Sequence, residues 1–280
     1  MSAPVRLEFT VLGCGSSGGV PRADGAWGHC DPAEPRNART RCSLMVRRLG
    51  TEDAPAKSLT TVVVDASPEF RLQTAAAGAA RLDALLLTHD HADQCHGIDD
   101  IRAFAMRQRG LIPCWADEPT RATLMKRFGY IFTGEGLYPP IAEIIDMPPF
   151  GQSFSIDGPS GSIQVSSFDQ DHGPVRSLGF RFGDVAYSSD VVGLPPSAVE
   201  ALQGLDVWIV DALRRAPHPT HAHLDLTLQW IERLAPRRAI LTNMHIDLDY
   251  QTLLSELPSG VEPAYDGLRV ISEFYQGNGR

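Results

Sequence analysis

The 280-residue sequence contains no apolar segment long enough to cross a membrane, and its first residues do not include the apolar stretch of a secretory signal. Basic residues are also outnumbered, because 25 lysines and arginines stand against 34 aspartates and glutamates, a formal net charge of -9. Such a chain repels the nucleic-acid backbone, so we expect no extended nucleic-acid surface and no membrane partner. A local basic pocket for one phosphate group remains compatible with this charge.

The five cysteines are odd in number and widely spaced, unlike a disulfide framework, which favours a cytoplasmic location. A structural zinc site on Cys14, Cys30 and Cys42 would need closely paired cysteines, and this spacing does not provide them. The sequence has no repeat or low-complexity tract, and an apolar content of 43% is enough for a sizeable core. We therefore predict a single domain over residues 1–280.

Short apolar runs that lead into a polar residue are the clearest strand candidates. Apolar runs that are not interrupted by alternating polar residues are typical of strands covered on both faces. Polar residues that follow the ends of several such strands predict a site along one rim of the sheet. A single such polar residue is usually a turn or cap residue, but five strands that each lead into one favour a site. The runs are Thr61–Val64 before Asp65, Ala84–Leu87 before His89, Val185–Tyr187 before Asp190, Val207–Val210 before Asp211, and Ala239–Leu241 before Asn243.

Helices are predicted between these strands, from the spacing of apolar residues and from capping signals. Strand-rich and helix-linked stretches occur in both halves of the chain, which predicts an α/β fold of two sheets enclosed by helices. The predicted helices are 68–79 after the candidate N-cap Ser67, 99–109, 118–128, 224–234, and 249–257, which Pro258 ends.

Eight of the nine histidines fall in four short clusters, and the densest is the segment from Thr88 to Gly97. His89 and His91 are two residues apart, so in extended backbone their side chains point the same way and can grip one ion. Imidazoles suit zinc, manganese or iron, and Asp93 lies close enough to bind a second ion or orient a water. An isolated His-x-His is more often a polar loop, but its place after an apolar strand favours metal binding.

This segment resembles the His-x-His-x-Asp-His signature of the metallo-β-lactamase superfamily. The resemblance continues in order along the chain, with Asp65 before the signature and Thr242-Asn243 where the superfamily usually has Thr-His. It implies a four-layer αβ/βα sandwich, the metallo-β-lactamase fold, and a metal-dependent hydrolase. It also implies that the ligands of the first metal are His89, His91, His172 and the bridging Asp190.

Within the superfamily, the sequence is most similar to the phosphoribosyl cyclic phosphodiesterases. The similarity is carried by the glycine-rich segment 12–21, Arg41-Cys42-Ser43, His221 before an amphipathic helix, and Tyr265-Asp266-Gly267. It implies a phosphodiesterase that acts on a small cyclic phosphate or a nucleotide-like molecule. That family carries a cysteine-rich zinc loop after its first strand, but residues 26–32 here contain one cysteine, so we expect no such zinc.

Two positions depart from the signature. Gln94 and Asn243 stand where histidines that bind the second metal are expected. A neutral amide oxygen is a weaker zinc ligand than imidazole, so the second site should be weak, empty or selective for a harder ion. His245 and His96 are candidates to substitute in part, although a loop role for His245 is the more ordinary interpretation.

The expected chemistry uses one zinc or manganese ion, which lowers the pKa of a bound water and supplies hydroxide near neutral pH. Asp93 would accept the water's proton or hold its orientation, and His221 would be the general acid, as the family likeness implies. Ser16 and Ser17, in the glycine-rich turn, and Arg41 are predicted to bind substrate. For Arg41, as for Arg22, Arg176 and Arg214, a surface ion pair is the ordinary alternative, and we expect one or two of the four to face the pocket.

Two alternatives remain open from the sequence. Loss of two metal ligands is compatible with a nucleotide- or metabolite-binding protein without turnover, and the fold alone does not separate phosphodiesters from thioesters, lactams or lactones. The acidic charge disfavours nucleic-acid processing. The expected partner is a small phosphorylated substrate, and the sequence leaves a homodimer open.

Overall fold

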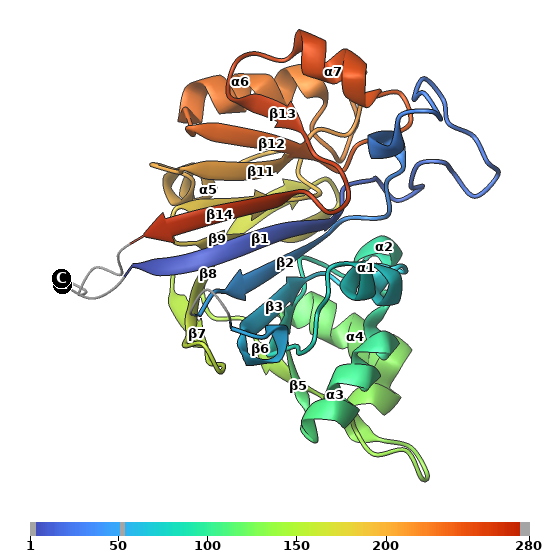
Figure 1. The fold of residues 1–280 in the computed structure, drawn as a ribbon, viewed down its shortest axis with the longest axis vertical. Coiled ribbons are helices and arrows are strands. Elements are labelled where there is room, and N and C mark those ends of the chain that lie inside the picture. Colours follow the sequence, from blue (N-terminus) through green and yellow to red (C-terminus); the bar gives the residue numbers. More distant parts are fainter. Residues whose placement is uncertain (1–3, 51–53, 275–280) are drawn as a thin grey trace.

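The computed structural model describes residues 4–50 and 54–274, which form two β-sheets packed between two layers of helices (Figure 1). The first sheet has the order β14-β1-β2-β3-β4-β5-β6, and the second has the order β13-β12-β11-β10-β9-β8-β7. The first contains β1 (Val5–Gly13), β2 (Ser43–Arg48), β3 (Thr60–Val64), β4 (Ala84–Leu86), β5 (Ile112–Ala116), β6 (Ala142–Asp146) and β14 (Arg269–Phe274). The second contains β7 (Ser153–Ile156), β8 (Ile163–His172), β9 (Val175–Phe182), β10 (Val185–Ser188), β11 (Val207–Asp211), β12 (Arg238–Thr242) and β13 (Val261–Pro263).

Buried apolar side chains hold the layers together. Phe9 from β1 and Phe182 from β9 meet edge to face between the two sheets, with ring centroids 5.9 Å apart. A second cluster lies between the first sheet and its helices, where Phe70 packs against Phe104. The helices are α1 (Phe70–Ala76), α2 (Ala92–Cys95), α3 (Arg102–Gln108), α4 (Glu118–Thr133), α5 (Pro196–Ala201), α6 (Leu224–Leu234) and α7 (Tyr250–Glu256), with 3₁₀ turns at Pro35–Asn37, Ala56–Ser58 and Ile98–Ile101. This arrangement confirms the predicted αβ/βα sandwich.

All five predicted strands are present, as β3, β4, β10, β11 and β12, within a residue or so of the expected bounds. Every residue of β3 and β11 is buried, as expected for strands covered on both faces. Within the described residues, no helix is both long and apolar enough to cross a membrane.

The predicted helices differ from the observed ones mainly at their ends. The helix expected over 224–234 is α6, and the one expected over 249–257 is α7, with Asp249 as its N-cap. The helix expected over 68–79 spans only α1, because the Ser67 hydroxyl accepts a hydrogen bond from the Glu69 amide and forms a turn first. The segment 99–109 divides into a 3₁₀ turn and α3, which ends where Arg109 adopts a left-handed backbone. The helix expected over 118–128 continues to Thr133 beyond a kink at Phe128.

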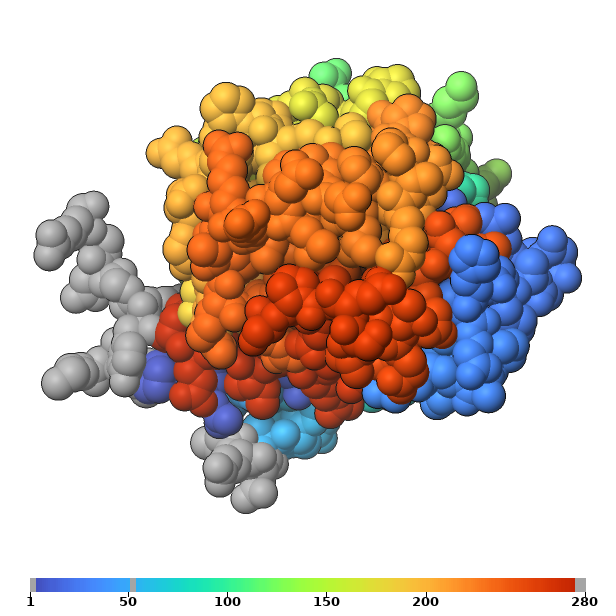
Figure 2. Space-filling model, turned by 90° about the horizontal axis from the view of Figure 1, so that it is seen from above, coloured from blue at the N-terminus to red at the C-terminus, as the bar shows by residue number. Residues whose placement is uncertain are grey.

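A long excursion between β1 and β2 lies beside α7 (Figures 1 and 2). The side chain of Asn37 holds this segment against α7. Its Nδ2 donates a hydrogen bond to the Asp249 carboxylate at 2.6 Å, and its Oδ1 accepts one from the Tyr250 backbone amide at 2.8 Å. At its start, Gly15 bridges to Met244, just after β12. The glycine-rich turn is therefore held against the rim of the second sheet.

Candidate metal centre

Three residues at strand ends turn the chain sharply at one rim. Asp65 after β3, Asp190 after β10 and Asn243 after β12 have left-handed backbones, with φ of 64°, 54° and 60°. Aspartate and asparagine tolerate this conformation better than most residues. Since β3 and β4 are parallel, as are β10, β11 and β12, their carboxyl ends bring these residues to one rim of each sheet.

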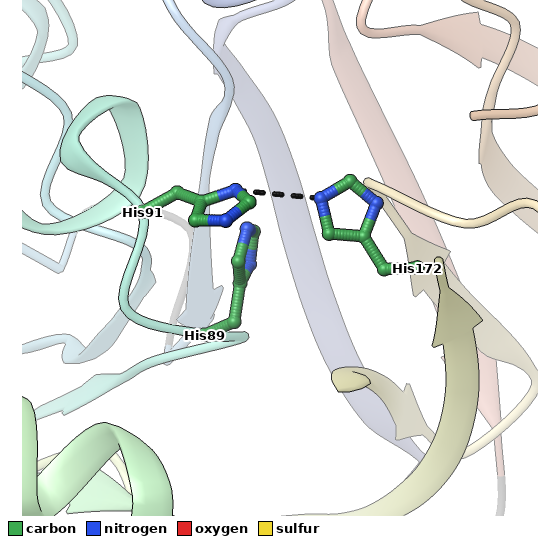
Figure 3. A group of neighbouring side chains, drawn as sticks. All are labelled: His89, His91 and His172. Atoms are coloured by element: carbon green, nitrogen blue, oxygen red, sulfur yellow. Dashed lines mark hydrogen bonds between the residues drawn. The ribbon is translucent and has the colours of Figure 1, made fainter. Parts of the chain in front are cut away.

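Three imidazoles converge at this rim (Figure 3). His89 follows β4, His91 is the N-cap of α2, and His172 ends β8 in the other sheet. The ring centroids of His89 and His91 are 4.4 Å apart, and those of His91 and His172 are 5.1 Å apart. One nitrogen from each ring lies within 4.8 Å of the others, a grouping that could hold a metal ion.

The rings direct nitrogen atoms toward the centre, where His91 Nδ1 and His172 Nε2 lie within hydrogen-bond distance of each other, at 3.4 Å (Figure 3). His172 Nδ1 lies 2.7 Å from the Thr220 carbonyl oxygen and donates to it, so Nε2 carries the lone pair. His89 Nδ1 lies 3.0 Å from the Thr88 hydroxyl, while its buried Nε2 has no hydrogen-bond partner among the described residues. Burial lowers the pKa of both histidines and keeps them neutral. Neutral imidazoles with an unpartnered buried nitrogen fit a divalent ion.

Asp190 supplies a carboxylate to the same group. Its side chain is 2% exposed, and its Oδ1 lies 4.0 Å from His172 Nε2 and 3.8 Å from His221 Nδ1. His172, Asp190 and His221 form a second set of donor atoms within 4.8 Å of one another. The structure therefore brings together the four residues predicted for the first metal, and it adds His221 beside them.

Gln94 occupies the space between two carboxylates. Its side-chain nitrogen donates to Asp190 Oδ2 at 3.0 Å and to Asp93 Oδ2 at 3.3 Å. Burial and the nearby charge of Asp190 raise the pKa of Asp93. A neutral amide therefore links two acids that could help to hold a second metal, and it offers them hydrogen-bond donors instead of a cation.

The other candidates for the second metal make different contacts. The Asn243 amide nitrogen lies 3.2 Å from His221 Nδ1. His245 binds Asp247 and Arg22, and His96 packs edge to face against Phe128. The hydrogen bonds of His245 are those of a satisfied loop histidine, the ordinary interpretation of the sequence.

His221 is held by a carboxylate that the sequence analysis did not assign to the site. Its Nδ1 lies 3.0 Å from Oδ2 of Asp211, which is fully buried at the end of β11. Burial lowers the pKa of His221, but Asp211, and after it Asp190 and Asp93, raise it more, to about 9. With Nδ1 donating to Asp211, Nε2 remains available to substrate. The position of Asp211 at the end of a predicted strand indicated that it lies at this rim. Its contact with His221 could not be predicted from the sequence.

Asp65 contacts the imidazole of His89 only through Thr88. Its Oδ1 accepts from the Thr88 amide at 2.8 Å, and its Oδ2 accepts from the Thr88 hydroxyl at 2.9 Å. Because the same hydroxyl contacts His89, Asp65 fixes the loop that carries this ring.

Of the predicted substrate-binding residues, Ser16 and Ser17 line a hollow beside His221, and Arg41 does not. The Arg41 guanidinium instead pairs with Glu69 at 2.7 Å, the ordinary alternative for such a residue. Arg176 likewise pairs with Asp169 and Asp171. The remaining two arginines, Arg22 and Arg214, line the hollow.

Comparison with known proteins identifies the family and the fold. A family model described as a beta-lactamase superfamily domain matches residues 60–246. A crystal structure of a diphosphatase from the PhnP family has a TM-score of 0.81 and 31% identity, covering 97% of this chain and 99% of the other. The metallo-beta-lactamase fold protein YhfI from Bacillus subtilis shares the fold, with a TM-score of 0.69 and 16% identity over 96% of this chain and all of the other.

A curated protein from Porphyromonas gingivalis, named octanoyltransferase, is 28% identical over 270 residues. The match covers 95% of this chain but 51% of the relative, so the chain spans about half of that protein's length. The family model, in contrast, covers more than half of this chain and contains every strand-end residue from Asp65 to Asn243. The chain therefore belongs to the metallo-β-lactamase superfamily of metal-dependent hydrolases.

Proposed function

We propose that this hydrolase is a phosphodiesterase that acts on a small cyclic phosphate or nucleotide-like substrate with one strongly held zinc or manganese ion. His89, His91, His172 and Asp190 would hold the ion. When bound, the ion supplies Lewis acidity, which activates water and offsets negative charge on the phosphate. The observation that carries the proposal is the convergence of three imidazoles and a buried carboxylate beside a hollow lined by arginines.

The chain's own residues supply the proton transfers. Asp93, whose pKa burial raises, is suited to accept a proton from the attacking water. His221 would donate a proton to the leaving oxygen, and Asp211 holds the ring by its Nδ1, which leaves Nε2 free to carry that proton. Asp211 is therefore a positioning residue.

The proposal is tested with bis(p-nitrophenyl) phosphate and zinc, manganese or iron. We expect turnover with at least one ion and its loss on chelation, because water activation depends on the ion. Absence of turnover with every ion, together with tight binding of a nucleotide, would instead support a binding protein.

A second candidate is hydrolysis of an acyl thioester. It is favoured by the name of the curated octanoyltransferase, half of whose length this chain matches. An octanoyl thioester assayed beside the phosphodiester separates the candidates. We expect cleavage of the diester alone, and cleavage of the thioester alone would replace the proposal with this candidate.

Restoring both histidines, as Gln94→His with Asn243→His, is expected to raise bound metal from about one to about two ions per chain. The reason is that the amide between Asp93 and Asp190 would give way to an imidazole, and a second imidazole would replace the Asn243 amide beside His221. Metal analysis of protein purified without chelator measures the change. The single variant Gln94→His is the matched control and should show an intermediate stoichiometry. An unchanged value in the double variant would contradict the assignment of these positions.

A further inference from the structure

The α1 pocket, with a volume of about 250 Å³, lies between α1 and the strands β1 and β14. Apolar side chains of β1 and α1 form much of its wall, among them Leu12, Leu72 and Ala77. Leu72 is 57% exposed, so an apolar occupant would remove its side chain from water. Among the described residues, the α1 pocket shares no lining side chain with the hollows beside His91 and His221. It is therefore separate from the metal centre.

Two polar side chains in the wall of the α1 pocket have no protein partner. Thr10 on β1 is 2% exposed, and its buried hydroxyl has no hydrogen-bond partner within residues 4–50 and 54–274. Arg269 on β14 is the direct cross-strand neighbour of Thr10, and its exposed guanidinium makes no ion pair or hydrogen bond with those same residues. A buried hydroxyl without a partner is costly, and a ligand oxygen beside it would remove that cost.

The other polar side chains of the wall are already engaged by protein groups. Asp266 Oδ1 accepts from the Cys14 amide at 3.1 Å, and Oδ2 accepts from the Thr40 amide at 2.8 Å and the Thr40 hydroxyl at 2.6 Å. These donors offset the negative charge of Asp266. Gln73 donates to the Thr40 hydroxyl at 2.8 Å and accepts from the Ser67 hydroxyl at 2.8 Å. The guanidinium and the unpartnered hydroxyl are therefore the polar groups left for an occupant.

This combination of groups fits a ligand with an apolar body and one anionic end. A carboxylate can accept two parallel hydrogen bonds from a guanidinium, and it has further lone pairs for a neighbouring hydroxyl. A volume of about 250 Å³ accommodates about eight water-sized groups at roughly 30 Å³ each, which is about the size of hexanoate. The apolar wall removes the hydrocarbon chain from water.

We propose that the α1 pocket binds an apolar carboxylic acid of medium length. The hydrocarbon chain lies against Leu12, Leu72 and Ala77, and the carboxylate accepts hydrogen bonds from Arg269 and Thr10. The site does not use the metal, so its test is independent of the proposed phosphodiesterase activity.

Hexanoate, acetate and 1-hexanol test the proposal when each is titrated into the full chain in a calorimeter. We expect hexanoate to bind with a Kd of about 1 mM or lower. Each buried methylene contributes about fourfold in affinity, so acetate, which lacks most of the hydrocarbon chain, should bind at least about 50-fold more weakly. 1-Hexanol keeps the chain but lacks the charge, and it should bind about 10-fold more weakly than hexanoate.

Three variants locate the binding. Ala76→Leu enlarges a side chain that lines the pocket and should abolish hexanoate binding. Arg269→Gln should weaken hexanoate by about 10-fold and leave 1-hexanol unchanged. Thr10→Val removes only the hydroxyl, so it should weaken hexanoate without loss of stability, because the hydroxyl has no partner within the described residues. The matched control is Arg6→Gln, on the same face of β1 but paired with Glu273 at 2.7 Å, and it should bind as the wild type does.

Circular dichroism checks that each variant is folded, which is expected for Ala76→Leu because Ala76 is exposed and leucine favours a helix. Absence of saturable hexanoate binding by the wild type would overturn the proposed site. Equal affinities for hexanoate and acetate would do the same. Hexanoate binding that is unchanged in both Ala76→Leu and Arg269→Gln would place the acid elsewhere on the protein, and that result also contradicts the proposal.

Discussion

Replacing His172 by alanine is expected to remove bound metal and to lower phosphodiester turnover by about 10³-fold or more. The ring comes from β8 in the second sheet, whereas His89 and His91 follow β4 in the first, so His172 joins the two halves of the centre. Loss of one of three imidazoles weakens the hold on the ion. The ion contributes several kcal/mol to the transition state, and each 1.36 kcal/mol is a factor of ten in rate.

The His172→Ala variant also leaves the Thr220 carbonyl without its donor, which costs about 1–3 kcal/mol of stability. His91→Ala separates this effect from metal loss, because His91 is exposed and makes no comparable bond to backbone within residues 4–50 and 54–274. His29→Ala, at an exposed position in the excursion between β1 and β2, is the control and should retain metal and activity. Metal content, kcat/KM and circular dichroism are measured together. A folded His91→Ala protein with unchanged metal content would contradict the assigned ligands.

The parts of this centre that could be predicted are those encoded locally. His89 and His91 are two residues apart in extended backbone, so their convergence follows from strand geometry. Each strand could be read from an unbroken apolar run, and each strand end from the polar residue after it. The ends of the helices were harder to predict than the strands. Ser67 caps a turn before α1, and α4 continues past its kink, and both features depend on tertiary packing.

The contacts that tune the centre join distant parts of the chain and left no local signal. Gln94 donates to Asp190 across 96 positions, and His172 donates to the Thr220 carbonyl across 48. The sequence indicated that Gln94 replaces a histidine, but only the structure places its amide between two acids. Arg41 illustrates the same limit, since its ion pair with Glu69 depends on how α1 packs beside β1.

Replacing His221 by alanine is expected to slow cleavage of diesters with alkoxide leaving groups by about 10²- to 10⁴-fold, the usual contribution of a general acid. The loss should be much smaller for bis(p-nitrophenyl) phosphate, because nitrophenolate departs without needing a proton. Asp211→Asn should also slow the cleavage of both kinds of diester, but by less than His221→Ala does. The reason is that an asparagine amide would still contact the ring that Asp211 holds at 3.0 Å. The ratio of kcat/KM between the two diesters measures the effect.

His223→Ala is the matched control, two positions along the chain, because the His223 side chain makes no capping hydrogen bond to α6. Metal content decides between the two roles that the geometry offers His221. His221 belongs to one group of possible ligand atoms with His172 and Asp190, as expected of a metal ligand. Its Nδ1 is hydrogen-bonded to Asp211, as expected of a histidine that donates a proton from Nε2. A His221→Ala protein that keeps its metal but loses only the alkoxide reaction behaves as a general-acid variant. Equal losses on both diesters, together with loss of metal, would make His221 a ligand and leave the leaving oxygen without this proton donor.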